Sequence, residues 1–128
     1  MREFDVDVGD HRLRGKTAPA DKQYEALHVA MRTGLIRAME PEANYSEMAI
    51  VAAMGGASFD EVKRLEDLLV GEKLVWRRED EVPLGRNLFV DQIEQYYLVL
   101  HRVAVENLGN FWRLRRPQGE DRAAAETS

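Results

Sequence analysis

Apolar residues recur every three or four positions between residues 59 and 69, and this run limits the fold more than any other feature of the sequence. Ser58 followed by Glu61 has the spacing of a capping box, in which the two side chains satisfy backbone N–H groups of a helix's first turn. Gly71 marks the expected C-terminal end of this helix, because glycine readily adopts the backbone conformation that ends a helix. We therefore expect an amphipathic helix whose apolar stripe consists of Phe59, Val62, Leu65, Leu68 and Leu69.

The N-terminal residues alternate instead of recurring at helical spacing. Phe4, Val6 and Val8 alternate with acidic residues. A Gly-Asp step then interrupts the pattern, and residues 12–14 resume it. Because alternation places every second side chain on the same face of a strand, the segment up to about residue 17 predicts a β-hairpin.

A helix is expected to follow this hairpin. Pro19 suits its first turn, because the N–H that proline lacks is unpaired there in any helix, and Pro41 closes the segment. The large apolar residues between them recur every three or four positions. They predict one buried face, formed by Tyr24, Leu27, Met31, Leu35 and Met39.

Another helix is expected to begin near Asn44, which has capping-box spacing to Glu47, and to end at the two glycines 55 and 56. Its apolar residues are Met48, Ile50, Val51 and Met54. Further along the chain, residues 74–76 predict a brief extended stretch and residues 79–87, with their proline and glycine, predict a loop.

The last and longest helix is expected from about Phe89 to Arg115. Its main stripe consists of Ile93, Tyr96, Tyr97, Leu100, Val103, Leu108, Phe111 and Trp112, and three further apolar residues lie outside that stripe, namely Leu98, Val99 and Val105. A helix with more apolar surface than one face needs is either central in its own domain or covered in part by a partner.

The length of 128 residues suits one domain with a sizeable core. We expect residues 1–116 to form it, as a mainly α fold: a small helical domain of about four helices with the N-terminal β-hairpin. Residues 117–128 contain no large apolar side chain, so burial cannot offset the entropy lost on ordering them. They predict a disordered polar tail.

Composition argues against several classes of protein. The absence of cysteine removes disulfides, thiolate zinc sites and cysteine nucleophiles, and it fits a cytoplasmic protein. No apolar run approaches the roughly 18 residues that span a bilayer. A net charge of −5 opposes binding through phosphate neutralisation, and the basic pair Arg77 and Arg78 is followed at once by three acidic residues. We therefore expect neither a membrane nor a nucleic acid as partner.

Motifs for catalysis are incomplete. Residues 9–17 resemble a phosphate-binding P-loop, but five residues separate its glycines where the motif needs four. Glu25 and His28 have the Glu-x-x-His spacing of di-iron bundles, but the chain lacks the second copy that such sites need. Ser46 and Ser58 fit helix caps better than they fit nucleophiles. The sequence thus predicts no catalytic residue, no metal ligand and no cofactor, and a protein that is not an enzyme.

Residues 46–78 leave one alternative open, a winged helix-turn-helix regulator that binds DNA. The order is that of such a domain: an apolar helix, a glycine-containing turn, a second helix and the start of a wing. Between residues 59 and 70, however, the second helix carries four acidic residues against Lys63 and Arg64. These acids would repel phosphates, so DNA binding is the minority interpretation.

The most distinctive motif lies at the C-terminal end, where residues 107–112 read Asn-Leu-Gly-Asn-Phe-Trp after the stretch Asn-Leu-Phe-Val-Asp-Gln-Ile at 87–93. A Gln-Tyr step at 23–24 and the hairpin precede it in the same order. On these residues the chain resembles the tail assembly chaperones of long-tailed phages and prophages, loosely over most of its length. Residues 27–32 depart from that family, which has paired arginines after the Gln-aromatic step. The matching motif residues are Gln23, Tyr24, Asn107, Leu108, Gly109, Phe111 and Trp112.

The resemblance implies a protein without enzymatic activity that binds the tape measure protein and keeps its helices from aggregating. It also implies that the protein brings tail tube subunits to the tape measure protein while the tail polymerises. Such a protein works in the cytoplasm of the host bacterium and is absent from the mature virion. Self-association into a homo-oligomer stays open.

The surplus apolar residues of the last helix predict where a partner binds. We expect Tyr97, Leu98, Val99 and Trp112 to contribute to that surface, and Leu100 and Phe111 to lie in the core. The methionines at 31, 39, 48 and 54 all lie on stripes that are expected to face the core.

Overall fold

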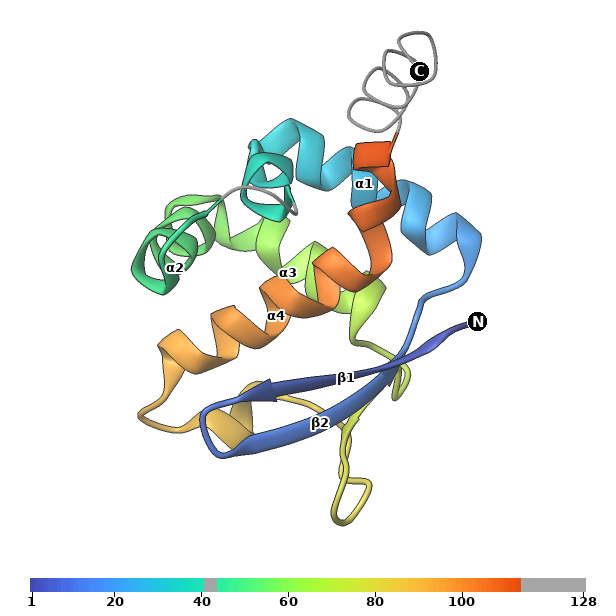
Figure 1. Ribbon diagram of the computed structural model, residues 1–128, viewed down its shortest axis with the longest axis vertical. Helices are drawn as coiled ribbons and strands as arrows, with labels where there is room; N and C mark the ends of the chain where they lie inside the picture. Colours follow the sequence, from blue (N-terminus) through green and yellow to red (C-terminus); the bar gives the residue numbers. More distant parts are fainter. Residues whose placement is uncertain (41–43, 114–128) are drawn as a thin grey trace, which may run out of the picture.

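The computed structural model describes residues 1–40 and 44–113, in which four α-helices lie on one side of a small antiparallel sheet (Figure 1). The sheet consists of β1 (Glu3–Val8), β2 (His11–Lys16) and β3 (Val75–Arg77), in that order. The helices are α1 (Ala20–Thr33), α2 (Glu47–Gly56), α3 (Phe59–Leu69) and α4 (Ile93–Leu108), joined by short 3₁₀ segments η1 (Leu35–Met39), η2 (Arg86–Phe89) and η3 (Gly109–Arg113). A mainly α fold with an N-terminal hairpin is therefore confirmed, and the sheet has a third strand.

The hairpin pairs its strands so that the inward residues are apolar and the outward residues carry opposite charges. Val6 lies opposite Leu13, and both are fully buried. On the outer face the acidic residues of β1 lie opposite the basic residues of β2, as the pairs Glu3 with Lys16, Asp5 with Arg14 and Asp7 with Arg12. Opposite charges directly across a sheet stabilise it, so this register is favoured on both faces.

Gly15 is needed because Phe4 folds over it. A Cβ at this position would lie 2.6 Å from the Phe4 ring and 3.2 Å from the carbonyl oxygen of Leu74. The missing side chain lets Phe4 reach the core, where it is 7% exposed.

The third strand comes from the stretch expected to be extended at residues 74–76. It pairs with β2 through Leu13 and Arg77, and Lys16 donates its backbone N–H to the carbonyl of Leu74. Residues 79–87 are expected to form a loop. The chain reverses direction there, and Leu84 donates its N–H to the carbonyl of Val75. The last residues of this region belong to η2.

The single helix expected from Pro19 to Pro41 is wrong in two respects. α1 ends at Thr33, because Gly34 adopts a left-handed conformation (φ 80°) and donates its N–H to the carbonyl of Met31. The chain then continues as η1. The expected apolar face is also wrong in part, since Tyr24 is 70% exposed and Met31 is 51% exposed, whereas Leu35 and Met39 are buried.

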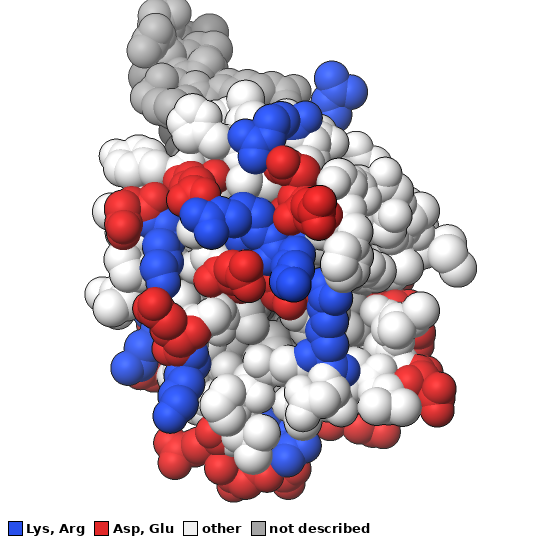
Figure 2. Space-filling model, turned by 180° about the vertical axis from the view of Figure 1, so that it is seen from behind, with Lys and Arg blue, Asp and Glu red and all other residues white. Residues whose placement is uncertain are grey.

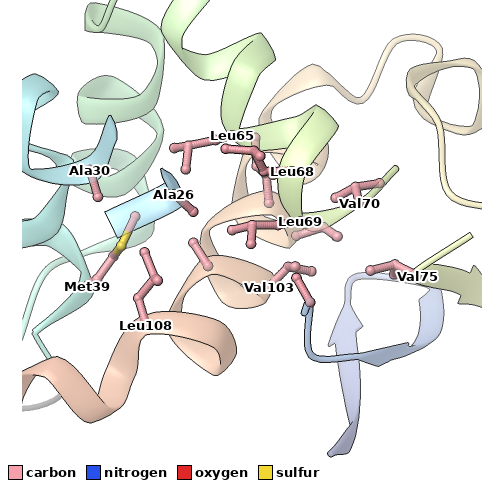
Figure 3. Packing of buried hydrophobic residues seen from close by; sticks show 14 of the residues in the cluster. Ala26, Ala30, Met39, Leu65, Leu68, Leu69, Val70, Val75, Val103 and Leu108 are labelled. Atoms are coloured by element: carbon pink, nitrogen blue, oxygen red, sulfur yellow. The ribbon is translucent and has the colours of Figure 1, made fainter. Parts of the chain in front are cut away.

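The face that α1 buries consists of small residues, Ala26, Val29 and Ala30. Figure 3 shows Ala26 on the side where Leu65 and Leu68 of α3 approach. Small side chains let two helix axes come close, and the leucines of α3 fill the space between them. Packing of α1 on α3 therefore turns the larger residues of α1 outward.

The N-cap of helix α2 is Ser46, not Asn44. The Ser46 hydroxyl accepts the backbone N–H of Ala49 at 3.1 Å, which makes it the N-cap. Of the α2 methionines expected in the core, Met54 is buried but Met48 is 76% exposed. α3 follows after Ser58 and buries its expected stripe except Phe59, which is 57% exposed.

Helix α4 is the central element, in contact with β1 and with each of the other three helices. It begins at Ile93 instead of Phe89, because residues 86–92 form η2 and a turn. Val99 and Leu100 are both fully buried, so the surplus apolar residues of this helix serve packing on several sides. All the elements contribute to one core, whose centre is drawn in Figure 3. The helix also ends at Leu108, where η3 takes over, instead of continuing to Arg115. The tail expected at 117–128 lies outside the described residues.

Candidate functional site

Two motif residues that lie far apart in sequence meet at the end of α4. Asn107 is buried, and its Oδ1 accepts the backbone N–H of Ala18 at 2.8 Å and the side-chain amide of Gln23 at 3.2 Å. Its Nδ2 donates to the carbonyl of Val103 at 2.9 Å. Asn107 thus ties the start of α1 to the end of α4, and this pair of motif residues has a structural role.

The other motif residues divide between core and surface. Leu108 and Trp112 are 5% and 7% exposed, and Phe111, half-buried, meets the Trp112 ring edge-on at a centroid distance of 5.3 Å. Gly109 starts η3, which carries both rings back onto the core. Tyr24 is the exception, since most of its side chain is in solvent.

The expected binding residues at the end of the sequence are only in part on the surface. Val99 is fully buried and Trp112 nearly so, which means that neither can contact a partner without unfolding of the core. Tyr97 and Leu98 are half-buried. Leu100 is in the core as expected, whereas Phe111 lies at its edge.

An apolar cleft of about 240 Å³ lies between the first turns of α3 and α4. Phe59 and Ile93 stand on its rim, and they are 57% and 72% exposed. The lining is completed by Arg86, Phe89, Tyr96 and Tyr97. Helical spacing predicts that Phe59 and Ile93 lie on buried stripes, because spacing alone does not show where a stripe runs past the edge of the core.

Arg86 gives the cleft a defined wall. Its guanidinium lies over the Phe59 ring, 4.7 Å from the centroid, and forms an ion pair with Glu66 at 2.9 Å. Burial and the neighbouring Glu66 carboxylate raise the pKa of Tyr96 well above its usual range, so its phenol stays neutral. The cleft therefore offers apolar and aromatic surface with its charges already paired.

Two larger depressions lie on the outer face of the sheet and are lined mostly by charged residues around Trp76 and Arg78. Most of their arginines are paired with carboxylates: Arg14 binds Asp5 at 2.9 Å, Arg77 binds Asp80 at 2.7 Å, and Arg78 binds Asp7. Arg12 instead donates to the backbone carbonyl of Gly9 at 2.7 Å. Across the part of the chain that the structure describes, no three histidine, aspartate or glutamate side chains gather to hold a metal ion.

Ion pairs also cover the face that a DNA-binding domain would use. Residues 46–78 do contain α2, α3 and β3 in the expected order. However, Arg64 of α3 is paired with Glu25 of α1, and Glu61 of α3 with Arg32 at 2.7 Å. Blue and red side chains accordingly alternate over this face in Figure 2. A recognition helix presents free cations to phosphates, and α3 instead faces α1, so this arrangement does not favour the DNA-binding alternative.

No helix in residues 1–40 or 44–113 combines the length and the hydrophobicity needed to cross a membrane. No protein-family model, no curated protein and no solved structure matches this chain.

Proposed function

We propose that this protein is a tail assembly chaperone of a long-tailed phage or prophage, which binds the tape measure protein and helps to recruit tail tube subunits. The observation that carries the proposal is the apolar cleft with Phe59 and Ile93 on its rim. A protein that holds another protein before assembly needs exposed apolar surface of this kind, and a net charge of −5 keeps it dispersed meanwhile.

The shape of the cleft suits a side chain from an amphipathic helix. Helix-in-groove recognition inserts apolar residues spaced three or four positions apart into a hydrophobic groove. Tyr97 and Phe89 form aromatic walls, against which an inserted leucine or phenylalanine loses its contact with water. Since Arg86 is neutralised by Glu66, apolar contact rather than charge would govern this step.

A second apolar surface supports the recruiting role. Tyr24 and Met31 lie two helical turns apart on the exposed side of α1, with half-buried Leu27 between them. A protein that brings two partners together needs two separate surfaces, and this stripe on α1 is distinct from the cleft lining. We assign the cleft to the tape measure protein and the stripe on α1 to the tail tube subunit.

Binding experiments with crossed variants test this assignment. A purified tape measure protein and a purified tail tube protein of a long-tailed phage are titrated into the full chain by calorimetry. Phe59→Ala and Ile93→Ala should each weaken tape measure binding about tenfold or more, as expected for anchor residues, and leave tail tube binding unchanged. Tyr24→Ala should do the reverse, so each variant is the matched control of the other. Wild-type protein that binds neither partner would refute the proposal.

A further inference from the structure

Both segments that form the rim of the apolar cleft also carry acidic residues. On α3, Asp60 follows Phe59 directly. On the α4 side, Asp91 and Glu94 stand just before and just after Ile93 in the sequence. All three acidic residues are exposed. The apolar opening is therefore bordered by negative charge on the α3 side and on the α4 side.

These three acids differ from the acid behind the cleft wall in having no partner. Glu66 is paired with Arg86 at 2.9 Å. Within residues 1–40 and 44–113, in contrast, Asp60, Asp91 and Glu94 form neither an ion pair nor a side-chain hydrogen bond. The charge of the lining is thus neutralised, whereas the charge at the border of the rim is open to a cation from another molecule.

Other charges near the rim leave this negative charge in excess. Lys63, one helical turn after Phe59, has no ion-pair partner in the described part of the chain, but the three carboxylates outnumber it. Asp60 and Glu94 lie in the first turns of α3 and α4, where the partial positive charge of a helix N-terminus favours them. That effect is small at exposed positions, so both carboxylates can still pair with an incoming cation.

We propose that the cleft selects helices whose apolar anchor residues are flanked by lysine or arginine. The inference rests on the proposed function, in which a helix of the tape measure protein enters the cleft, and it adds the charge of that helix. Basic residues three or four positions from an apolar anchor border the apolar stripe of an amphipathic helix. With the anchor in the cleft, such residues meet Asp60 on one side and Glu94 on the other.

Charge also separates this partner from other occupants. A second copy of this chain carries a net charge of −5, and a nucleic acid is an anion, so both are repelled by the acidic border. A helix with the same apolar anchors but acidic flanks is repelled for the same reason. Apolar contact supplies the affinity, and the border discriminates between helices with equal apolar anchors.

Three labelled synthetic peptides test the inference. They share one pattern of leucines at helical spacing and differ only in the residues that border it, which are all lysine, all glutamine or all glutamate. The full chain is titrated into each, and binding is followed by fluorescence anisotropy. At low salt the lysine peptide should bind at least about tenfold more tightly than the glutamate peptide. The ratio should shrink in about 0.5 M NaCl, because salt screens exposed charges.

A variant that keeps the shape of the rim but removes its charge identifies the residues responsible. Asp60→Asn, Asp91→Asn and Glu94→Gln are combined in one chain, since asparagine tolerates the left-handed backbone at position 91 (φ 62°). Its affinity for the lysine peptide should fall to that for the glutamine peptide, which should not change. Ile93→Ala should weaken all three peptides alike, because it removes apolar contact.

The matched control removes three exposed carboxylates away from the cleft lining, by Glu3→Gln, Asp21→Asn and Glu81→Gln in one chain. The net charge changes by the same amount in this control and in the rim variant. The control should keep the preference for the lysine peptide. Loss of the preference in the control would assign it to the overall charge of the chain and would overturn the inference.

Three further results overturn it: equal affinity for the lysine and glutamate peptides, a preference that persists in the rim variant, and no binding of any peptide at about 1 mM. The inference and the proposed function fail separately, because the peptides need no phage protein. A tape measure protein that binds while the lysine and glutamate peptides bind equally refutes the charge selection alone. A preference for the lysine peptide without binding of the tape measure protein refutes the proposed function alone.

Discussion

The imidazole of His101 in α4 donates its Nε2 hydrogen to the carbonyl oxygen of Ala38 in η1, at 2.6 Å. This bond joins the central helix to the 3₁₀ segment that replaces the expected last turns of α1. His101 is 8% exposed, so the bond holds two parts of the core together where little water can compete for it.

Stability should fall on mild acidification because of His101. Burial lowers the pKa of His101 below its ordinary 6.5, partly opposed by the bond to Ala38. The unfolded chain therefore takes up a proton at His101 near pH 6.5, whereas the folded chain takes it up only at a lower pH. The stability that neutral His101 contributes is complete above pH 6.5 and is lost as the pH falls through the folded pKa. Thermal melts of wild type and His101→Gln, compared between about pH 7 and 5, should show a smaller decline for the variant. His28→Gln, at an exposed position, should keep the wild-type slope. Equal slopes for His101→Gln and wild type would contradict this origin of the acid sensitivity.

Removing Asn107 should cost more than removing its partner Gln23. Asn107→Ala deletes three hydrogen bonds and leaves the N–H of Ala18 unpaired in a buried place, so the free energy of unfolding should drop by about 1–3 kcal/mol. Gln23→Ala loses one part-buried bond and should cost about 0.5–1.5 kcal/mol. Urea denaturation measures both, and the double variant should cost less than the two single losses added together. Strict additivity would mean that the two side chains do not interact.

Gly15→Ala should destabilise the hairpin through Phe4. The new methyl group would lie 2.6 Å from the Phe4 ring, and overpacking of this kind costs about 1–3 kcal/mol. The matched test is Gly15→Ala in a Phe4→Leu background, where the smaller side chain should remove much of the added penalty. The same penalty in both backgrounds would point instead to the Leu74 carbonyl.

Leu100 and Tyr24 should differ sharply in their effect on stability. Leu100 is fully buried in the central helix, and Leu100→Ala should cost about 2–5 kcal/mol, because it leaves a cavity. Tyr24→Ala removes a mostly exposed ring and should change the free energy of unfolding by no more than about 0.5 kcal/mol. Denaturant titrations give both values. A large loss for Tyr24→Ala would show that α1 buries its outer stripe after all.

Much of the secondary structure could be predicted because its causes are local. The alternation at Phe4 and Val6 and the spacing at Leu65 and Leu69 show which side chains share a face, and those four residues are buried as expected. Less of the candidate site was predictable. The excess of apolar residues in the last helix predicts Tyr97 as a binding residue, but helical spacing assigns Phe59 and Ile93 to buried stripes, and both are exposed. Val99 is expected on the surface and is fully buried.

Most helices and strands of this protein follow from the local sequence, because periodicity, caps and breaks act within a few residues of one another. Which surfaces remain open depends instead on how these elements pack. Ala26 and Ala30 became the buried face of α1 because α3 approaches there, and Tyr24 was left in solvent as a result. Gln23 and Asn107 are separated by 84 residues, so their bond follows from packing that no local pattern encodes.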